Sequence, residues 1–240
     1  MKNRVGEKWI TNQGYLVEIT QYISSKNCTI QFEDGSTLSN LYFVNIVKGK
    51  VSNPNHKSVN GVGCVGKGFK NLTKTICYMK WADMLKRTHN KKYLLSRPKY
   101  LNVTVCNEWL DFSSFADWFN KKYNSEIMQD WHLDKDLLSK GNKIYSPETC
   151  CFIPLEINSI FVSKRVRKND LPRGIGKVKE RYRVRVANKH YGYFDTVEEA
   201  FQAYKIAKEA YIKEVADKWQ PYIEPKVYIA MYNYEVEITD

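Results

Sequence analysis

Apolar and polar residues alternate in two short runs near the N-terminus, at residues 15–20 and 28–32. Successive side chains of a strand point to opposite faces, so this alternation predicts half-buried β-strands. The segment Glu33–Ser36 contains Gly35 and predicts a turn between two such runs. We therefore expect residues 1–66 to form a small β-barrel-like module.

A glycine-rich segment, residues 61–68, follows this module. Glycine weakens regular structure because it permits many backbone conformations. A phosphate-binding loop would have to follow a strand, but residues 53–58 ahead of it are turn formers. The pattern favours a linker, with a nucleotide-binding loop as the alternative.

Helical spacing of apolar residues begins at Thr75 and again near Asp111. Large aromatic residues recur at this spacing in the second segment: Trp109, Phe112, Phe115, Trp118 and Phe119. Such a stripe can stack on nucleic-acid bases, but it is more typical of a hydrophobic core. We expect these rings to lie in the core.

Residues 131–158 have the pattern of a strand, a turn, a strand and a short helix. In the first strand, His132, Asp134 and Asp136 would share one face, and Leu133, Lys135 and Leu137 the other. A face with one histidine and two carboxylates can bind a divalent cation. A solvated acidic strand is the alternative.

The last third predicts three antiparallel strands, at residues 174–178, 181–187 and 190–194. In the middle strand, Arg181, Arg183 and Arg185 would share one face, opposite the apolar alternate positions. Thr196 and Glu199 have the spacing of a capping box and predict the start of a helix. The apolar stripe of this helix would cover the other face of the sheet.

Charge gives the first indication of a partner. The chain has 38 Lys and Arg against 26 Asp and Glu, a net charge of +12. Between Phe161 and Lys189, eleven basic residues face only two acidic ones. These basic residues are Lys164, Arg165, Arg167, Lys168, Arg173, Lys177, Lys179, Arg181, Arg183, Arg185 and Lys189. Such a segment attracts nucleic acid, and guanidinium groups pair with phosphates and guanine edges. Duplex DNA is therefore the expected partner. The residues expected to contact it are Arg173, Lys177, Lys179, Arg181, Arg183, Arg185, Lys189 and Tyr191.

Several classes of protein are disfavoured. No apolar run approaches the ~20 residues of a membrane span, and the N-terminus lacks the apolar core of a signal peptide. The six cysteines lack the paired spacing of a zinc site, and Cys150 and Cys151 fit buried structural thiols. We expect an intracellular protein without zinc and without a membrane partner.

Two family resemblances follow from these motifs. The run Tyr182-Arg-Val-Arg-Val-Ala, continued by Tyr191-Gly-Tyr-Phe-Asp-Thr-Val-Glu-Glu-Ala, resembles the Apetala-type (ethylene-response-factor-like) DNA-binding domain. That resemblance covers about residues 170–217 and implies a three-stranded sheet, backed by one helix, that docks in the major groove.

Residues 78–158 resemble the HNH endonuclease-like proteins of bacteriophages. The resemblance rests on Tyr78-Met-Lys-Trp81, Val105-Cys-Asn-Glu-Trp109, Leu133-Asp134-Lys135-Asp136, Tyr145-Ser-Pro-Glu-Thr-Cys150 and Asn158. It implies a ββα-metal finger in which Asp134 and Asn158 hold Mg²⁺ or another divalent cation. It also implies a location in the cytoplasm of a bacterial host.

The sequence departs from that family at its catalytic position. Lys135 stands where the family has its catalytic histidine, and an ordinary ammonium cannot accept a proton at neutral pH. Three interpretations remain: a desolvated Lys135 acts as the base, His132 or Asp136 acts instead, or the module no longer cuts DNA. We interpret Asn142 as a turn residue that braces the finger.

Taken together, the sequence predicts an α+β chain in four segments. These are the β module (1–66), an HNH-like ββα-metal domain embedded in helices (67–162), an Apetala-type domain with a three-stranded antiparallel sheet and a helix (163–220), and a tail that forms a short helix and strand (221–240). The predicted function is metal-dependent cleavage of duplex DNA. The alternative is an inactive DNA-binding regulator or an inhibitor of a host enzyme, and RNA binding is a third possibility. The oligomeric state and the DNA sequence are not predicted.

Overall fold

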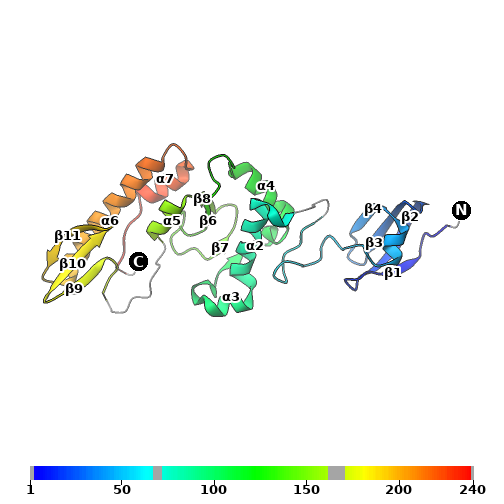
Figure 1. The fold of residues 1–240 in the computed structure, drawn as a ribbon, viewed down its shortest axis with the longest axis horizontal. Helices are drawn as coiled ribbons and strands as arrows, with labels where there is room; N and C mark the ends of the chain where they lie inside the picture. Colours follow the sequence, from blue (N-terminus) through cyan, green and yellow to red (C-terminus); the bar gives the residue numbers. More distant parts are fainter. Residues whose placement is uncertain (1–2, 67–71, 162–170, 239–240) are drawn as a thin grey trace. The chain divides into compact units, whose positions relative to one another are not determined.

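The protein is described by a computed structural model that covers residues 3–66, 72–161 and 171–238. It divides into two compact units, Met1–Trp118 and Phe119–Asp240. Helices combine with antiparallel sheets in both parts of the chain (Figure 1), so the predicted α+β class is confirmed. Within the described ranges, no helix is both long enough and apolar enough to span a bilayer.

The first unit begins with a four-stranded antiparallel sheet in the order β1-β2-β3-β4. Its strands are β1 (Lys8–Ile10), β2 (Leu16–Ser24), β3 (Asn27–Phe32) and β4 (Thr37–Leu41), followed by the short helix α1 (Phe43–Val47). The predicted turn between β3 and β4 has Gly35 at φ 81°, and Asp34 Oδ1 accepts hydrogen bonds from the backbone N–H and the hydroxyl of Ser36. These bonds hold the pKa of Asp34 well below its usual range.

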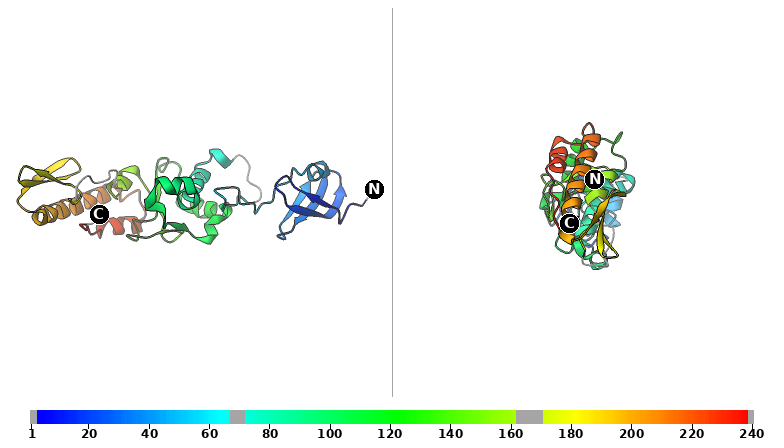
Figure 2. Two further views of the ribbon diagram at one scale, coloured as in Figure 1. Left: turned by 90° about the horizontal axis from the view of Figure 1, so that it is seen from below. Right: turned by 90° about the vertical axis from the view of Figure 1, so that its left-hand side faces the viewer.

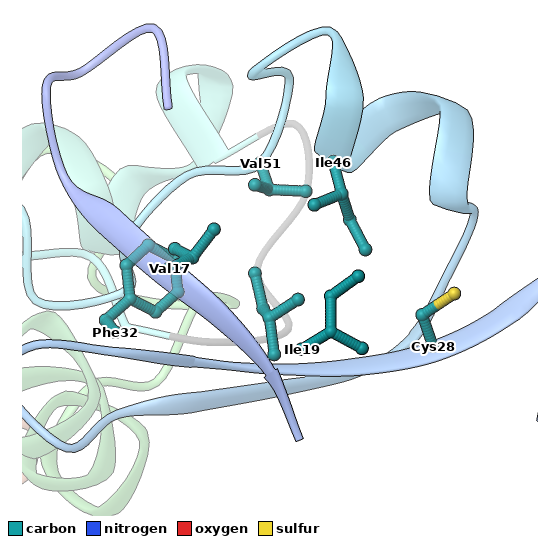
Figure 3. Packing of buried hydrophobic residues seen from close by; sticks show 7 residues of the cluster. Val17, Ile19, Cys28, Phe32, Ile46 and Val51 are labelled. Atoms are coloured by element: carbon teal, nitrogen blue, oxygen red, sulfur yellow. The ribbon is translucent and has the colours of Figure 1, made fainter. Parts of the chain in front are cut away.

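Period-two burial explains the core of this sheet. Val17 and Ile19 of β2 and alternate residues of β3 are buried, whereas the residues between them are more exposed. Figure 3 shows Ile46 of α1 and Val51 facing the strand residues from one side. The alternation therefore places one face of the sheet against α1 and the segment after it.

The glycine-rich segment does not behave as a linker over its described part, residues 61–66. Cys64 donates its backbone N–H to Leu110 O and accepts from Phe112 N. A Cβ at Gly63 would lie 2.9 Å from the Trp81 ring, so only glycine permits this approach. The segment is bound to the aromatic core, and Lys67 and Gly68 lie outside the described residues.

The rest of the first unit is helical around that aromatic core. Its elements are η1 (Leu72–Lys74), α2 (Ile76–His89), α3 (Lys91–Ser96), η2 (Pro98–Tyr100), β5 (Thr104–Val105), η3 (Asn107–Leu110) and α4 (Phe112–Lys122), which runs into the second unit. Trp81 Nε1 donates to Trp109 O at 2.7 Å, and Trp109, Phe112 and Phe115 are buried. The predicted core position is confirmed for these three rings and for Phe119, whereas Trp118 is half-buried.

The second unit continues with three short strands and a helix, β6 (His132–Asp134), β7 (Ile144–Tyr145), β8 (Cys151–Ile153) and α5 (Leu155–Phe161). The predicted strand, turn, strand and helix are present, but two short strands, β7 and β8, stand where one was predicted. β6 and β8 pair antiparallel, with Asp134 opposite Cys151. The chain therefore forms a ββα arrangement from β6, β8 and α5.

The C-terminal sheet has the order β11-β10-β9 and is antiparallel. Its strands are β9 (Ile175–Val178), β10 (Arg181–Val186) and β11 (Lys189–Phe194), and helix α6 (Val197–Trp219) follows. The capping box is present: Thr196 Oγ1 accepts from Glu199 N, and the Glu199 carboxylate accepts from Thr196 N. Figures 1 and 2 show the sheet lying along α6 in each view.

The tail differs from its predicted form. Helix α7 (Pro225–Tyr232) packs against α6, with Val227 and Met231 buried. The predicted strand after it is wrong: residues 233–238 are not extended in a sheet. The backbone N–H of Val236 donates instead to the Glu209 carboxylate of α6, which occupies a donor that a sheet would need.

Candidate functional site

The arginines of β10 project from the face of the sheet opposite α6. Val184 and Val186 are buried beneath α6, whereas Arg181 and Arg185 are exposed and Arg183 is half-buried. This is the period-two arrangement that the sequence predicts. We call the side of the sheet that carries these arginines the arginine face.

Arg183 differs from the other two arginines of this face in that its guanidinium is not bonded to the described part of the protein. The strand register places it between Gly176 of β9 and Tyr193 of β11. Gly176 adds no side chain, and Tyr193 is 44% exposed. Among the described residues, the guanidinium of Arg183 has neither a hydrogen-bond nor an ion-pair partner, and its side chain is half-buried.

The two flanking arginines are bonded to the protein itself. Arg181 Nε donates to Asp195 Oδ1 at 2.8 Å, and its Nη2 donates to Tyr193 O at 2.9 Å. Arg185 Nη2 donates to Asn188 O at 3.1 Å. Both side chains of the Arg181–Asp195 pair are exposed, so the pair stabilises the fold by at most ~1 kcal/mol. A phosphate can therefore take the place of the carboxylate at little cost.

The other predicted DNA-contacting residues lie on the strands of this sheet, in its turn or just before it, and one of them faces away from the arginines. Lys179 occupies the turn between β9 and β10 at φ 52°, and Lys189 Nζ lies 5.6 Å from the ring centroid of the exposed Tyr191. Lys177 pairs with Tyr182, so it projects on the α6 side and is not part of the arginine face. Arg173 is half-buried just before β9.

Four further basic residues of the sequence prediction cannot be placed. Lys164, Arg165, Arg167 and Lys168 lie outside the described residues. The local charge excess is therefore placed only for its C-terminal part, from Arg173 onward.

Asp134 ends strand β6 and starts the loop of the finger. Its Oδ1 accepts the backbone N–H groups of Asp136 and Leu137, at 2.9 and 2.8 Å, which turns the chain out of the strand. Burial raises the pKa of Asp134 above its ordinary value, and the two backbone donors only partly oppose this shift. A nearby cation would stabilise this desolvated carboxylate.

This turn corrects part of the predicted strand. β6 ends at Asp134, so Lys135 and Asp136 are loop residues and Asp136 does not continue a strand face with His132 and Asp134. Burial still alternates beyond the strand: Lys135 and Leu137 are buried and Asp136 is exposed. The predicted division into a buried and an outer side therefore holds without the strand geometry.

Lys135 is held inside the finger loop. Only 7% of its side chain is exposed. Its Nζ donates to Asp136 Oδ1 and, at 2.9 Å, to Asn142 O, and it lies 5.8 Å from the ring centroid of Tyr145. In both hydrogen bonds the amine is the donor, and both acceptors belong to the loop itself. This geometry assigns Lys135 to the structure of the loop rather than to the role of base.

Asn142 connects the two ends of the same loop. Its Nδ2 donates to Lys135 O at 2.8 Å and to Ile144 O at 2.7 Å, and its Oδ1 accepts from Ile144 N at 3.2 Å. All three bonds join the side-chain amide to backbone groups of the loop. The side chain is therefore engaged by the chain itself.

A cation site in the finger would have few protein ligands. Asp134 lies on β6 and Asn158 on α5, two elements in contact, and His132 precedes Asp134 on the same side of β6. Among the described residues, no three His, Cys, Asp or Glu side chains gather as a metal-binding group. One carboxylate and one amide suit Mg²⁺, which keeps several water ligands, better than zinc.

The two adjacent cysteines beside this site are buried thiols. Cys150 and Cys151 are fully buried, and neither is in a disulfide. Burial raises the pKa of Cys150 to about 12, and the pKa of Cys151 is raised as well. A thiol is a weak ligand compared with a thiolate, so these side chains act as small apolar groups.

No protein-family model, curated protein or solved structure matches this chain. The family resemblances therefore rest on the sequence motifs alone. The availability of Arg183 and the internal bonds of Lys135 were not readable from those motifs, because both depend on strand register and loop closure.

Proposed function

We propose that this chain binds duplex DNA through the arginine face of β9–β11. The observation that carries the proposal is the guanidinium of Arg183, which projects from the central strand away from α6. Guanidinium groups bond bidentately to the O6 and N7 atoms of guanine and to phosphates, and the major groove admits a β-ribbon. The net charge of +12 adds attraction for the phosphate backbone.

The neighbouring residues would orient the duplex. Arg181 and Arg185 are held in place by their bonds to Tyr193 O and Asn188 O, so their side chains lose little freedom on binding. Lys189 and Tyr191 lie on the edge strand β11 and would contact the sugar-phosphate backbone. The Apetala-type resemblance of this segment agrees with such a docking mode.

A pair of substitutions in one sheet tests the proposal. Arg183→Ala should weaken duplex affinity by ~1 to 3 kcal/mol if the guanidinium contacts a base. Lys177→Ala removes one charge from the opposite face and should cost clearly less. Fluorescence anisotropy with a labelled duplex library measures both, and equal losses for the two variants would refute the arginine face. An equal affinity for single-stranded RNA would instead support the RNA-binding alternative.

Metal-dependent cleavage of DNA is a second candidate function. The observation that favours it is the ββα arrangement that brings Asp134 and Asn158 onto contacting elements. A divalent cation held there would stabilise charge on the scissile phosphate and on the leaving oxygen. His132 is the candidate base, because histidine is the residue type most suited to proton transfer near neutral pH and Lys135 is bonded within the loop.

Cleavage is tested on supercoiled plasmid with Mg²⁺ and with Mn²⁺. Asp134→Ala and His132→Ala should each reduce nicking at least ~100-fold if both groups act in the reaction. Lys135→Met should retain the parent's cleavage, since it removes only the amine. A parent that binds duplex but leaves the plasmid intact would support a non-catalytic DNA-binding regulator or an inhibitor of a host enzyme.

A further inference from the structure

A second strongly basic segment lies in the first unit, on α2, α3 and η2. From residue 76 to residue 101 the chain has seven Lys and Arg against Asp83 alone, and no acidic residue occurs between Met84 and Asn107. Arg87 pairs with Asp83. Five basic residues of the segment are exposed, and we call them the α2–α3 basic surface: Lys86, Lys91, Lys92, Arg97 and Lys99.

Helix stability does not explain these charges. Cations in the last turn of a helix are favourable, which accounts for Lys86. Lys91 and Lys92 are the first two residues of α3, where the helix dipole disfavours positive charge. The same turn is capped by Asn90, whose Oδ1 accepts from Tyr93 N, so the lysines add no capping bond. A partner of negative charge would account for their position.

Two of the lysines are held by aromatic rings. Lys86 Nζ lies 5.3 Å from the ring centroid of Tyr93, and Lys99 Nζ lies 5.2 Å from that of Tyr100. The two rings are themselves 5.8 Å apart, so the ammonium groups belong to one cluster. Each lysine stem is restrained before binding, which lowers the entropy lost when a phosphate is contacted.

We propose that the α2–α3 basic surface is a second contact with duplex DNA, made to the phosphate backbone without reading sequence. The inference rests on the proposed function for its ligand class but not on the arginine face. Ammonium groups are compact charges without the planar fork that reads a base, so lysine is the residue type suited to this role. One unit of the chain would then read sequence and the other would add affinity.

The salt dependence of binding tests this surface in the full chain. Replacing Lys86, Lys91, Lys92 and Lys99 together with Gln should reduce the magnitude of the slope of log K against log salt by ~3.6, because each neutralised phosphate contributes ~0.9. The same four residues changed to Arg should keep the parent slope. A matched control changes four exposed lysines of the N-terminal module, Lys26, Lys48, Lys50 and Lys57, to Gln.

The outcomes separate this surface from the arginine face. Retention of the parent slope by the α2–α3 Gln variant, or an equal loss in the control variant, would overturn the inference while leaving the arginine face intact. A variant with Arg181, Arg183 and Arg185 changed to Ala should lose preference among duplex sequences but keep salt-dependent binding. If that variant binds like the parent while the Gln variant is weakened, the arginine face is wrong and the second surface stands.

Discussion

Replacing Lys135 separates a structural role of this residue from a catalytic one. The side chain is 7% exposed, and its amine donates to Asn142 O and Asp136 Oδ1. Lys135→Ala removes the buried methylenes beyond Cβ, at about 0.8 kcal/mol each, for a loss of about 2 kcal/mol. It also leaves the Asn142 carbonyl without its donor, which costs about 1 to 2 kcal/mol more. We expect a total loss of about 3 to 4 kcal/mol.

Lys135→Met divides that total into its parts. Methionine keeps most of the buried stem, so only the loss at the Asn142 carbonyl remains, and we expect about 1 to 2 kcal/mol. The pair with Asp136 contributes little, because 58% of the aspartate side chain is exposed to water. Lys143→Ala, an exposed change in the same loop, should alter stability by less than ~0.5 kcal/mol and serves as the control.

Urea unfolding, followed by tryptophan fluorescence and by circular dichroism, measures these differences. Trp131 and Trp219 lie in the same unit as the loop, with ring centroids 6.0 Å apart, and report its unfolding. If Lys135→Ala is as stable as the parent, the ammonium does not hold the loop and the structural assignment of Lys135 is wrong.

Two further changes test the geometry of the second unit. The pKa of Asp134 is raised in the folded protein, so ionisation of this carboxyl lowers stability as the pH rises through that pKa. Asp134→Asn keeps the Oδ1 acceptor without the charge and should therefore be more stable than the parent at neutral pH. This advantage should shrink as the pH falls toward ~4, and thermal melts across pH that show a constant difference would contradict it. Gly174→Ala places a Cβ 2.2 Å from the Tyr204 ring at φ +77°, so it should lower the stability by about 2 to 4 kcal/mol and weaken duplex affinity. Gly141→Ala is also at positive φ but in open space, so it should lower the stability by only about 1 kcal/mol. Similar melting temperatures for the two glycine variants would show that the Tyr204 contact does not constrain the sheet.

The C-terminal sheet could be predicted because local patterns decide it. Arg183 alternates with Val184, a capping box marks the start of α6, and the turn at Asn188 has positive φ at 67°. Each of these signals depends on a few neighbouring residues. Which face Lys177 occupies was not readable, because the register between β9 and β10 is set by pairing across the turn.

The finger could be predicted only in outline. Periodicity indicated that His132 and Asp134 share a side, but the strand ends where the Asp134 carboxylate captures two backbone N–H groups. The contact of Lys135 with Asn142 closes a loop of several residues, and no local pattern encodes it. The tail strand was wrong for a similar reason, since a carboxylate on α6 captures the N–H of Val236.

The buried lysine of the finger loop bears on whether the second unit stays folded when metal ions are removed. Small domains that depend on a bound ion for their fold unfold when a chelator removes it. Here the cation that ties Asn142 to the loop is covalently part of the chain, so it has no dissociation constant and cannot be diluted away. The loop should therefore keep its fold in EDTA, and any effect of a chelator would report on chemistry at Asp134 rather than on the integrity of the fold.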